Sequence, residues 1–393
     1  MKIKLCDLKL FFSIFLCMIP VGLFLIPGFK IIWYSALGMM LCGFCIKRYY
    51  VYTKFDNWNA AYLFLYLIMH AIATFINNGN WKYNILTLVV IVLITIFCNY
   101  EINYNYKCFI YFVDKVLITV ITIESILHLT NIGNYFMDFA CLRLYYICWA
   151  VVNIINHMHN KKNKSLYMVS IFLVLITIIK PDIGSDGKAN YEWTFYLIVL
   201  ILLFTKLSFN KTSIFSKFIG GKKVFTIIVI LNLFFTIFQS FINSSFFQYI
   251  IVSIMHKSGD ISGRSGIWKM ALSLYVRSPV WGYGISLAGI ENTGDYWIEF
   301  MRNSGPHNQI LYILLSGGMV TLVFYILMFY KIICRLSRSE KKYSYIICMG
   351  ILASYIELLV TFRNMINCIP LFILFSLGYY SPKYKEKNHF DNK

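Results

Sequence analysis

The sequence predicts an all-α, polytopic integral membrane protein with about 12 transmembrane helices and one large extracytoplasmic loop. Hydrophobic residues make up 59% of the 393 residues and charged residues only 13%, whereas soluble domains contain about 45–50% and about 25%. Apolar runs near the length of about 20 residues that a spanning helix needs recur along the chain. A disordered chain is excluded by the high hydrophobicity, and a single soluble core does not grow to this size.

Twelve apolar runs are candidate spans, and they lie at 9–27, 30–46, 59–76, 84–98, 108–130, 138–156, 166–180, 192–208, 224–242, 308–330, 343–361 and 365–380. The first run follows Lys2, Lys4 and Lys9, as a signal peptide would. It has no small-residue cleavage site, so we expect it to be a retained span.

The basic residues orient these spans. With both termini in the cytoplasm, 24 Lys and Arg residues fall in inner connections and five in short outer ones. This asymmetry is the positive-inside pattern. The net charge of +19 is therefore mainly an orientation signal. We expect the basic runs to contact membrane lipid and expect no nucleic-acid partner.

The long connection between the ninth and tenth spans, residues 243–307, is the exception among short loops. It divides the chain into spans one to nine (1–242), this extracytoplasmic loop, spans ten to twelve (308–380) and a cytoplasmic tail (381–393). Long ordered loops are usually functional. Within the loop, apolar spacing predicts a helix over 267–277, ended by a Ser-Pro pair and followed by a turn.

Four short motifs lie in and after this loop. A Ser-Gly-Arg triplet ends at Arg264 and is followed four residues later by Trp268. Pro279–Gly284 has the form Pro-x-x-Gly-x-Gly, His307-Asn308 stands at the mouth of the tenth span, and Gly317-Gly318 lies within it. In this order and spacing, the motifs resemble the O-antigen ligase and polysaccharide polymerase family.

The resemblance implies a GT-C-type glycosyltransferase with about twelve spans and a large loop between the ninth and tenth. Members of the family transfer glycan from undecaprenyl diphosphate to an acceptor sugar at the outer face of the bacterial cytoplasmic membrane. The resemblance implies no metal and no cofactor, with flippase and chain-length-regulator proteins as partners. Asp295 and Glu299 are too few carboxylates for a hard-cation site.

Three loop residues carry the expected chemistry. Negative charge grows on the diphosphate as the glycosidic bond breaks, and arginine binds phosphate oxygens in a bidentate manner. We assign this role to Arg264, which matches the family's loop arginine, and to Arg302; the alternative is contact with lipid headgroups. His307, which matches the family's His-Asn motif, is the candidate general base, or alternatively a residue that caps a helix. Asn308 would orient the imidazole or bind a sugar hydroxyl.

Ionisable residues inside spans are costly and suggest function. Glu124 and His128 share one helix face, and Arg143, Glu357 and Arg363 are also expected near the outer ends of their spans. One substrate-binding cavity open to the outer leaflet would account for all five. The alternative is structural ion pairing, for example between Glu124 and Arg143.

Several functions remain open. The first is polymerisation of lipid-diphosphate-linked repeat units into O-antigen or capsular polysaccharide, and the second is ligation of finished polymer to lipid A core or another acceptor. The motifs do not separate these two. A polysaccharide flippase would be expected to show internal repeats and a midplane site. A membrane O-acyltransferase would need a histidine within a span or on the inner side, and His70 is the one mid-span candidate.

Overall fold

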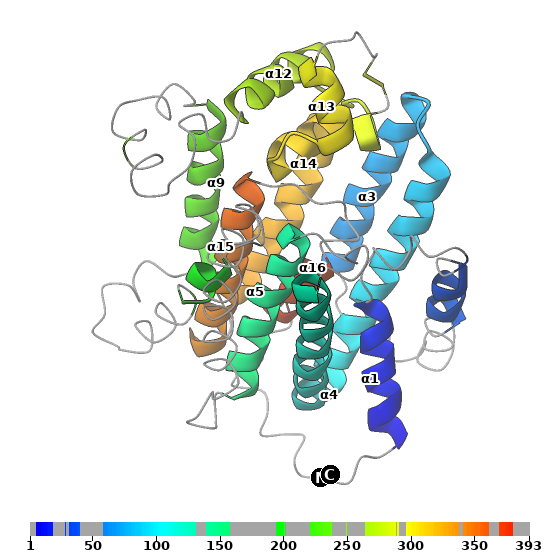
Figure 1. The fold of residues 1–393 in the computed structure, drawn as a ribbon, viewed down its shortest axis with the longest axis vertical. Helices are drawn as coiled ribbons and strands as arrows, with labels where there is room; N and C mark the ends of the chain where they lie inside the picture. Colours follow the sequence, from blue (N-terminus) through cyan, green and yellow to red (C-terminus); the bar gives the residue numbers. More distant parts are fainter. Residues whose placement is uncertain are drawn as a thin grey trace.

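The computed structural model describes residues 5–18, 28, 31–39, 58–130, 139–157, 194–199, 201, 221–237, 249, 264–287, 289–290, 296–337, 341–360 and 369–379. All regular structure in these ranges is helical, which confirms the all-α prediction (Figure 1). The labelled helices are α1 (Leu5–Cys17), α3 (Trp58–Ile76), α4 (Trp81–Thr130), α5 (Phe139–Asn156), α9 (Gly221–Ile237), α12 (Arg264–Arg277), the 3-10 turn η4 (Ile285–Leu287), α13 (Tyr296–Ser304), α14 (Gln309–Leu336), α15 (Lys341–Val360) and α16 (Ile369–Tyr379). Residues 31–39 and 194–199 are also helical.

Six helices coincide within a few residues with expected spans: α3, α5, α9, α14, α15 and α16. Among the described residues, α14 alone is long and apolar enough to cross a membrane by itself, and five helical stretches elsewhere are apolar but shorter. The span expected at 166–180 lies outside the described residues. The structure therefore supports the helical assignments without fixing the number of crossings.

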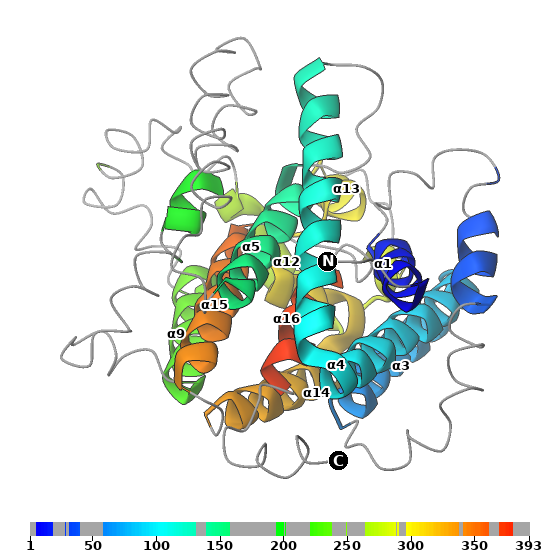
Figure 2. The ribbon, with the colours of Figure 1, turned by 90° about the horizontal axis from the view of Figure 1, so that it is seen from below.

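Helix α4 corrects one expectation. Two separate spans, 84–98 and 108–130, were expected with Lys107 in the inner connection between them, but Trp81–Thr130 forms one helix of 50 residues. This helix bends sharply along its length, so its two parts run in different directions (Figure 2). The polar stretch between the two apolar runs contains no Gly or Pro, and Asn103 Nδ2 donates to Asn99 O at 2.8 Å within the helix. Polarity alone was therefore a poor signal for a turn.

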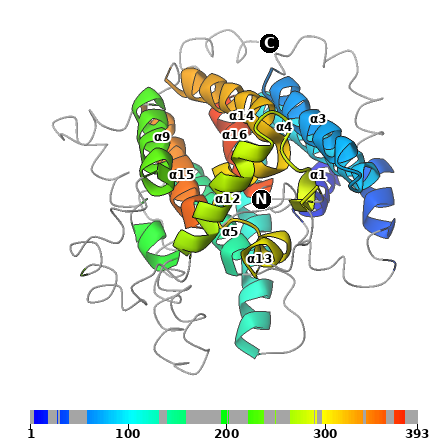
Figure 3. The ribbon, with the colours of Figure 1, turned by 90° about the horizontal axis from the view of Figure 1, so that it is seen from above.

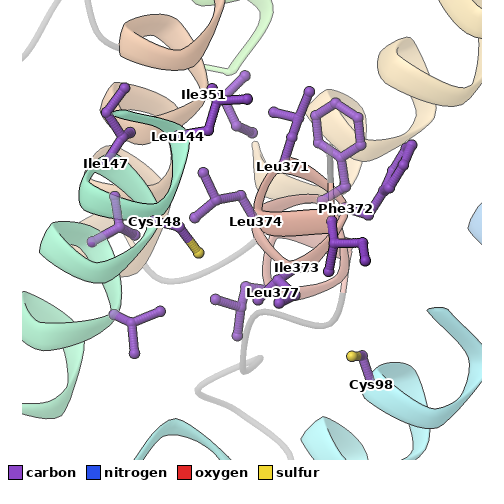
Figure 4. Packing of buried hydrophobic residues seen from close by; sticks show 14 of the residues in the cluster. Cys98, Leu144, Ile147, Cys148, Ile351, Leu371, Phe372, Ile373, Leu374 and Leu377 are labelled. Atoms are coloured by element: carbon purple, nitrogen blue, oxygen red, sulfur yellow. The ribbon is translucent and has the colours of Figure 1, made fainter. Parts of the chain in front are cut away.

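The core of the helical bundle surrounds α16. Every residue of α16 is buried, and it packs against α4, α5, α14 and α15. Figure 4 shows Leu374 of α16 pointing toward Leu144 and Cys148 of α5. The face of α5 around Trp149 is equally buried, so α5 and α16 form the centre of the bundle.

A second, smaller core lies at one end of the molecule. We call α12, η4, α13 and the turns that join them to one another and to α14 the loop layer. In Figure 1 this layer lies above α14, and Figure 3 shows it from above, in front of the bundle helices. Its apolar side chains pack on Leu311 and Leu315 in the first two turns of α14. These side chains are Ile267, Trp268, Ala271, Leu274, Leu287, Ile290, Ile298 and Met301. The predicted helix at 267–277 and its end at Ser278 are confirmed, with the helix starting three residues earlier.

Candidate functional site

His307 lies where the loop layer meets the bundle, two residues before α14 begins. Its backbone is left-handed, with φ of 47°, and Gly305 before it also has a positive φ of 68°. A non-glycine residue in this region costs free energy and is often found at functional sites. The imidazole is half-buried, and its ring centroid lies 5.6 Å from that of Phe300 in α13. The imidazole of the predicted base therefore lies against α13.

Trp268 fixes the backbone next to His307. The indole is buried in the loop-layer core, and its Nε1 donates to the carbonyl oxygen of Pro306 at 2.9 Å. A buried Trp usually places its N–H on a partner. Trp268, which belongs to the Ser-Gly-Arg motif, thus holds Pro306, the residue directly before His307 of the His-Asn motif.

Asn308 caps α14. Its Oδ1 accepts from the amides of Ile310 and Leu311, both at 3.0 Å, in the geometry of an N-cap residue. Its Nδ2 donates to Leu359 O, near the end of α15, at 3.2 Å. The side chain is fully buried. The helix-capping role that was an alternative for His307 therefore belongs to Asn308. Both the oxygen and the nitrogen of its side-chain amide bind other protein groups.

The two candidate arginines belong to the same layer as His307. Arg264 begins α12, and Arg302 lies in α13. At both positions the structure describes the main chain alone. Helices α12 and α13 pack against each other through Ile267, Ala271, Ile298 and Met301. The backbones of all three candidate catalytic residues thus lie around one small core.

Helix α14 is broken within the membrane-spanning stretch, at the Gly317-Gly318 motif. Gly318 has φ of 69° and ψ of −170°, which is not helical. The turn that follows α12 occupies the break: Tyr283 N donates to Leu315 O at 2.6 Å, Gly284 N donates to Ser316 O at 2.9 Å, and Met319 N donates to Pro279 O at 2.8 Å. Irregular backbone at membrane depth must have its polar groups satisfied by protein in this way.

The glycines of the two motifs permit this close approach. A Cβ added at Gly318 would lie 2.0 Å from Val280 O, and one at Gly282 would lie 2.5 Å from Leu315 O. Both residues also have positive φ, which glycine adopts without a steric penalty. The second and fourth sequence motifs, Pro279–Gly284 and Gly317-Gly318, are thus the two halves of one backbone contact.

Tyr283 joins this turn to α12. Its hydroxyl donates to Leu274 O at 2.8 Å. Partial burial raises the pKa of Tyr283, and the nearby charge of Arg277 opposes that rise. The phenol is therefore protonated at neutral pH and can act as the donor.

The intramembrane charges are placed only in part. Arg143 Nη2 of α5 donates to Glu357 Oε1 of α15 at 2.7 Å, in a buried ion pair. Glu357 lies two residues before Leu359, which accepts from Asn308, so this pair borders the entrance of α14. Glu124 is fully buried in α4, the structure describes only the main chain of His128, and Arg363 lies outside the described residues.

Metal binding was not expected from the sequence. Across the described ranges, no group of three or more His, Cys, Asp or Glu side chains is placed to hold a metal ion. The absence of a metal and of a cofactor remains a prediction.

Thr74 of α3 and Asn77, the residue after its end, contact the turn and were not singled out from the sequence. Thr74 and Asn77 bind backbone atoms of the turn. They look ordinary in the sequence, because a Thr and an Asn near a helix end suggest only local hydrogen bonds. Their partners lie more than 200 residues away in the chain.

Comparisons with known proteins agree with the motifs. Residues 192–326 match a family described as O-antigen ligase, and this segment includes α12, α13, His307 and the break in α14. The match confirms the resemblance and indicates a polytopic membrane protein. No solved structure matches the chain.

Two curated relatives come from Rickettsia, and each is named "Putative polysaccharide ligase". The protein of Rickettsia conorii is 24% identical over 222 residues, which cover 54% of this chain and 49% of the relative. The protein of Rickettsia prowazekii is 26% identical over 211 residues, which cover 51% and 47%. The chain thus spans about half the length of these relatives.

Proposed function

We propose that this chain, which carries an O-antigen ligase domain over residues 192–326, polymerises undecaprenyl-diphosphate-linked oligosaccharide repeat units into O-antigen or capsular polysaccharide. The reaction takes place at the outer face of the bacterial cytoplasmic membrane, with both termini in the cytoplasm. The observation that carries the proposal is the placement of His307. Its half-buried ring sits on a left-handed backbone at the mouth of α14, beside the helices that bear Arg264 and Arg302.

The proposed reaction is a single displacement. His307 accepts the proton of the acceptor hydroxyl as that oxygen forms a bond to the anomeric carbon of the donor. The bond between the anomeric carbon and the phosphate oxygen breaks, and the diphosphate leaves on its lipid with inversion at the anomeric carbon. Arg264 and Arg302 stabilise the charge that develops on the diphosphate, a type of interaction whose loss costs about 2.7–4 kcal/mol.

The remaining candidates take supporting roles in this proposal. Asn308 positions His307 by capping the helix that follows it. Arg143 and Glu357 bind each other and hold the ends of α5 and α15 beneath the site. Glu124, His128 and Arg363 are proposed contacts of the sugar at the same end of the bundle.

Ligation is the second candidate, because both curated relatives are named as ligases. A ligase would use the same lipid-diphosphate donor and the same residues, but its acceptor would be lipid A core or another molecule. A flippase is disfavoured, because the sequence contains no internal repeat and its polar residues gather in one loop rather than at the midplane.

The test replaces Arg264 and His307 separately by Ala in the host strain and separates the surface polysaccharide on a gel. His157→Ala is the matched control, because His157 lies at the other end of α5 from Arg143. Polymerase function predicts single repeat units in both variants with normal amounts of protein in the membrane. Free polymer left on the lipid carrier would indicate ligation instead, and a normal long-chain ladder in both variants would refute the mechanism.

A further inference from the structure

Thr74 of α3 connects the bundle to the loop layer through one hydroxyl group. The side chain is buried. Its Oγ1 accepts from Ile285 N, the first residue of η4, at 2.9 Å, and donates to His70 O of its own helix at 2.7 Å. A hydroxyl supplies one donor and two acceptor positions. Thr74 can therefore accept from the amide of Ile285 and donate its own proton to His70 O at the same time.

Asn77 directly follows the last residue of α3, three residues after Thr74, and it binds the same turn. Its Nδ2 donates to Ala73 O at 2.7 Å and to Gly282 O at 3.2 Å. The loop backbone approaches this side chain closely, because a Cβ added at Gly289 would lie 2.1 Å from Asn77 Oδ1. Asn77 therefore contacts the turn both before and after η4.

The turn is thus held from two sides, by α3 and by the break in α14. We call residues 278–285, Gly317-Gly318, Thr74 and Asn77 the junction. On one side Thr74 and Asn77 supply side-chain hydrogen bonds. On the other side the backbone of the turn replaces helix hydrogen bonds lost at Gly318. An α14 without this turn would leave buried amides and carbonyls unsatisfied, which is costly.

Two routes lead from the junction to His307. In the first, Tyr283 binds the carbonyl of Leu274 in α12, and Trp268 of the same helix binds the carbonyl of Pro306. In the second, the part of α14 before the break runs directly back to its cap at Asn308. The position of His307 relative to the bundle therefore depends on how the junction is held.

We propose that Thr74 and Asn77 are positioning residues for glycosyl transfer, which hold the loop layer so that His307 meets the acceptor hydroxyl beside the donor at the outer end of the bundle. This inference rests on the proposed function. A shift of about 1 Å in a positioned group can slow a reaction by roughly a hundredfold, so loosening the junction is expected to reduce transfer without unfolding the bundle.

The test compares Thr74→Val, Thr74→Ser and Asn77→Ala with Thr95→Val. Thr95 is a matched control, because it is equally buried and its Oγ1 donates to Ile91 O of its own helix α4. Two quantities are measured on the full chain in lipid nanodiscs. One is hydrogen exchange in peptides from the turn and from α16, and the other is the transfer rate with a lipid-diphosphate oligosaccharide.

In Thr74→Val, the amide of Ile285 should exchange faster, peptides of α16 should be unchanged, and transfer should fall about tenfold, because a buried donor loses its acceptor. Thr74→Ser keeps the hydroxyl and should stay near wild type in both measurements. Asn77→Ala should show a smaller effect in the same direction, and Thr95→Val should leave both unchanged.

Three results would overturn the inference: unchanged exchange in Thr74→Val, faster exchange with wild-type transfer, or equal losses in Thr74→Val and Thr95→Val. A His307→Asn variant measured in parallel separates this failure from failure of the proposed function. If the inference alone is wrong, His307→Asn is still inactive. If His307 is not the base, His307→Asn transfers at the normal rate, regardless of the hydrogen exchange measured in peptides from the turn.

Discussion

The bundle and the loop layer satisfy their polar groups in different ways. In the bundle, many buried Thr and Ser hydroxyls bond to the preceding turn of their own helix, as Thr95 does to Ile91 O and Ser354 to Gly350 O, alongside cross-helix bonds such as that between Ser125 and Tyr146. In the loop layer, the hydrogen bonds run between elements, as from Trp268 to Pro306 O. Positive φ angles also gather in the loop layer, at Gly282, Gly284, Leu287, Gly305 and His307.

This difference separates the scaffold from the chemistry. A helix in lipid must satisfy its own backbone, so the bundle is stable locally and can hold an irregular layer at one end. The loop layer has only a small core, and its geometry depends on a few contacts across long stretches of chain. Substitutions should therefore have distinct effects in the two regions.

The largest effect is expected where the two regions meet, at Gly318. In Gly318→Ala the new Cβ would lie 2.0 Å from Val280 O on a backbone with positive φ. We expect the free energy of unfolding to fall by more than about 4 kcal/mol, measured as a large drop in melting temperature in detergent. Gly38→Ala is the control, because its Cβ meets nothing within 4 Å; equal losses in both variants would contradict the close contact.

The next largest effect concerns the buried ion pair of the bundle. Arg143→Leu leaves Glu357 as a buried charge without this partner, and breaking such a pair costs about 3–5 kcal/mol. The double variant Arg143→Leu with Glu357→Leu should recover much of the melting temperature, because two apolar residues can replace a buried pair. A double variant as unstable as the single one would show that the pair is not the reason for the loss.

Trp268→Phe tests a hydrogen bond of the loop layer. It removes the donor to Pro306 O and keeps an aromatic ring, so we expect a loss of about 1–3 kcal/mol in stability and roughly tenfold slower transfer. Trp149→Phe is the matched change in the bundle, since its Nε1 is buried with no hydrogen-bond partner among the described residues. Transfer should remain close to wild type in that variant, and a greater loss there than in Trp268→Phe would contradict the comparison.

The smallest effect is expected at the cap of α14. Asn308→Ala removes the acceptor for the amides of Ile310 and Leu311 and should cost about 1 kcal/mol. Asn308→Ser keeps a capping oxygen and loses the donor to Leu359 O, so its melting temperature should lie between that of Asn308→Ala and that of wild type. A Ser variant no more stable than Asn308→Ala would show that the capping oxygen contributes little, because both variants lack the donor to Leu359 O.

The sequence predicted the bundle better than the loop layer, for a physical reason. Runs such as 59–76 and 138–156 are recognisable because a spanning helix is apolar along its whole length, and α3 and α5 match them closely. The break expected between the spans 84–98 and 108–130 is absent, because the polar stretch between them contains no Gly or Pro and continues as helix in α4. Local polarity was misread there as a change of backbone conformation.

In the loop layer, residue type indicated the motifs but not their partners. The Gly-containing motifs were recognised, yet nothing in the sequence showed that Pro279–Gly284 fills the break at Gly318. Helix α13 was not expected, and Thr74 and Asn77 were missed because their contacts depend on the folded chain. Long-range backbone contacts leave no local pattern, so only the glycines that permit them could be noticed.

The central claim is that His307 is the base of glycosyl transfer, and its most direct test is the transfer rate of His307→Asn. Asparagine tolerates the left-handed backbone that His307 adopts, so the variant should fold normally and lose only the imidazole. We measure polymer formed from a lipid-diphosphate oligosaccharide by purified protein in liposomes, at matched protein amounts and melting temperatures. A fall of at least about a hundredfold is predicted from the usual contribution of a general base, and a rate within about twofold of wild type would contradict the account.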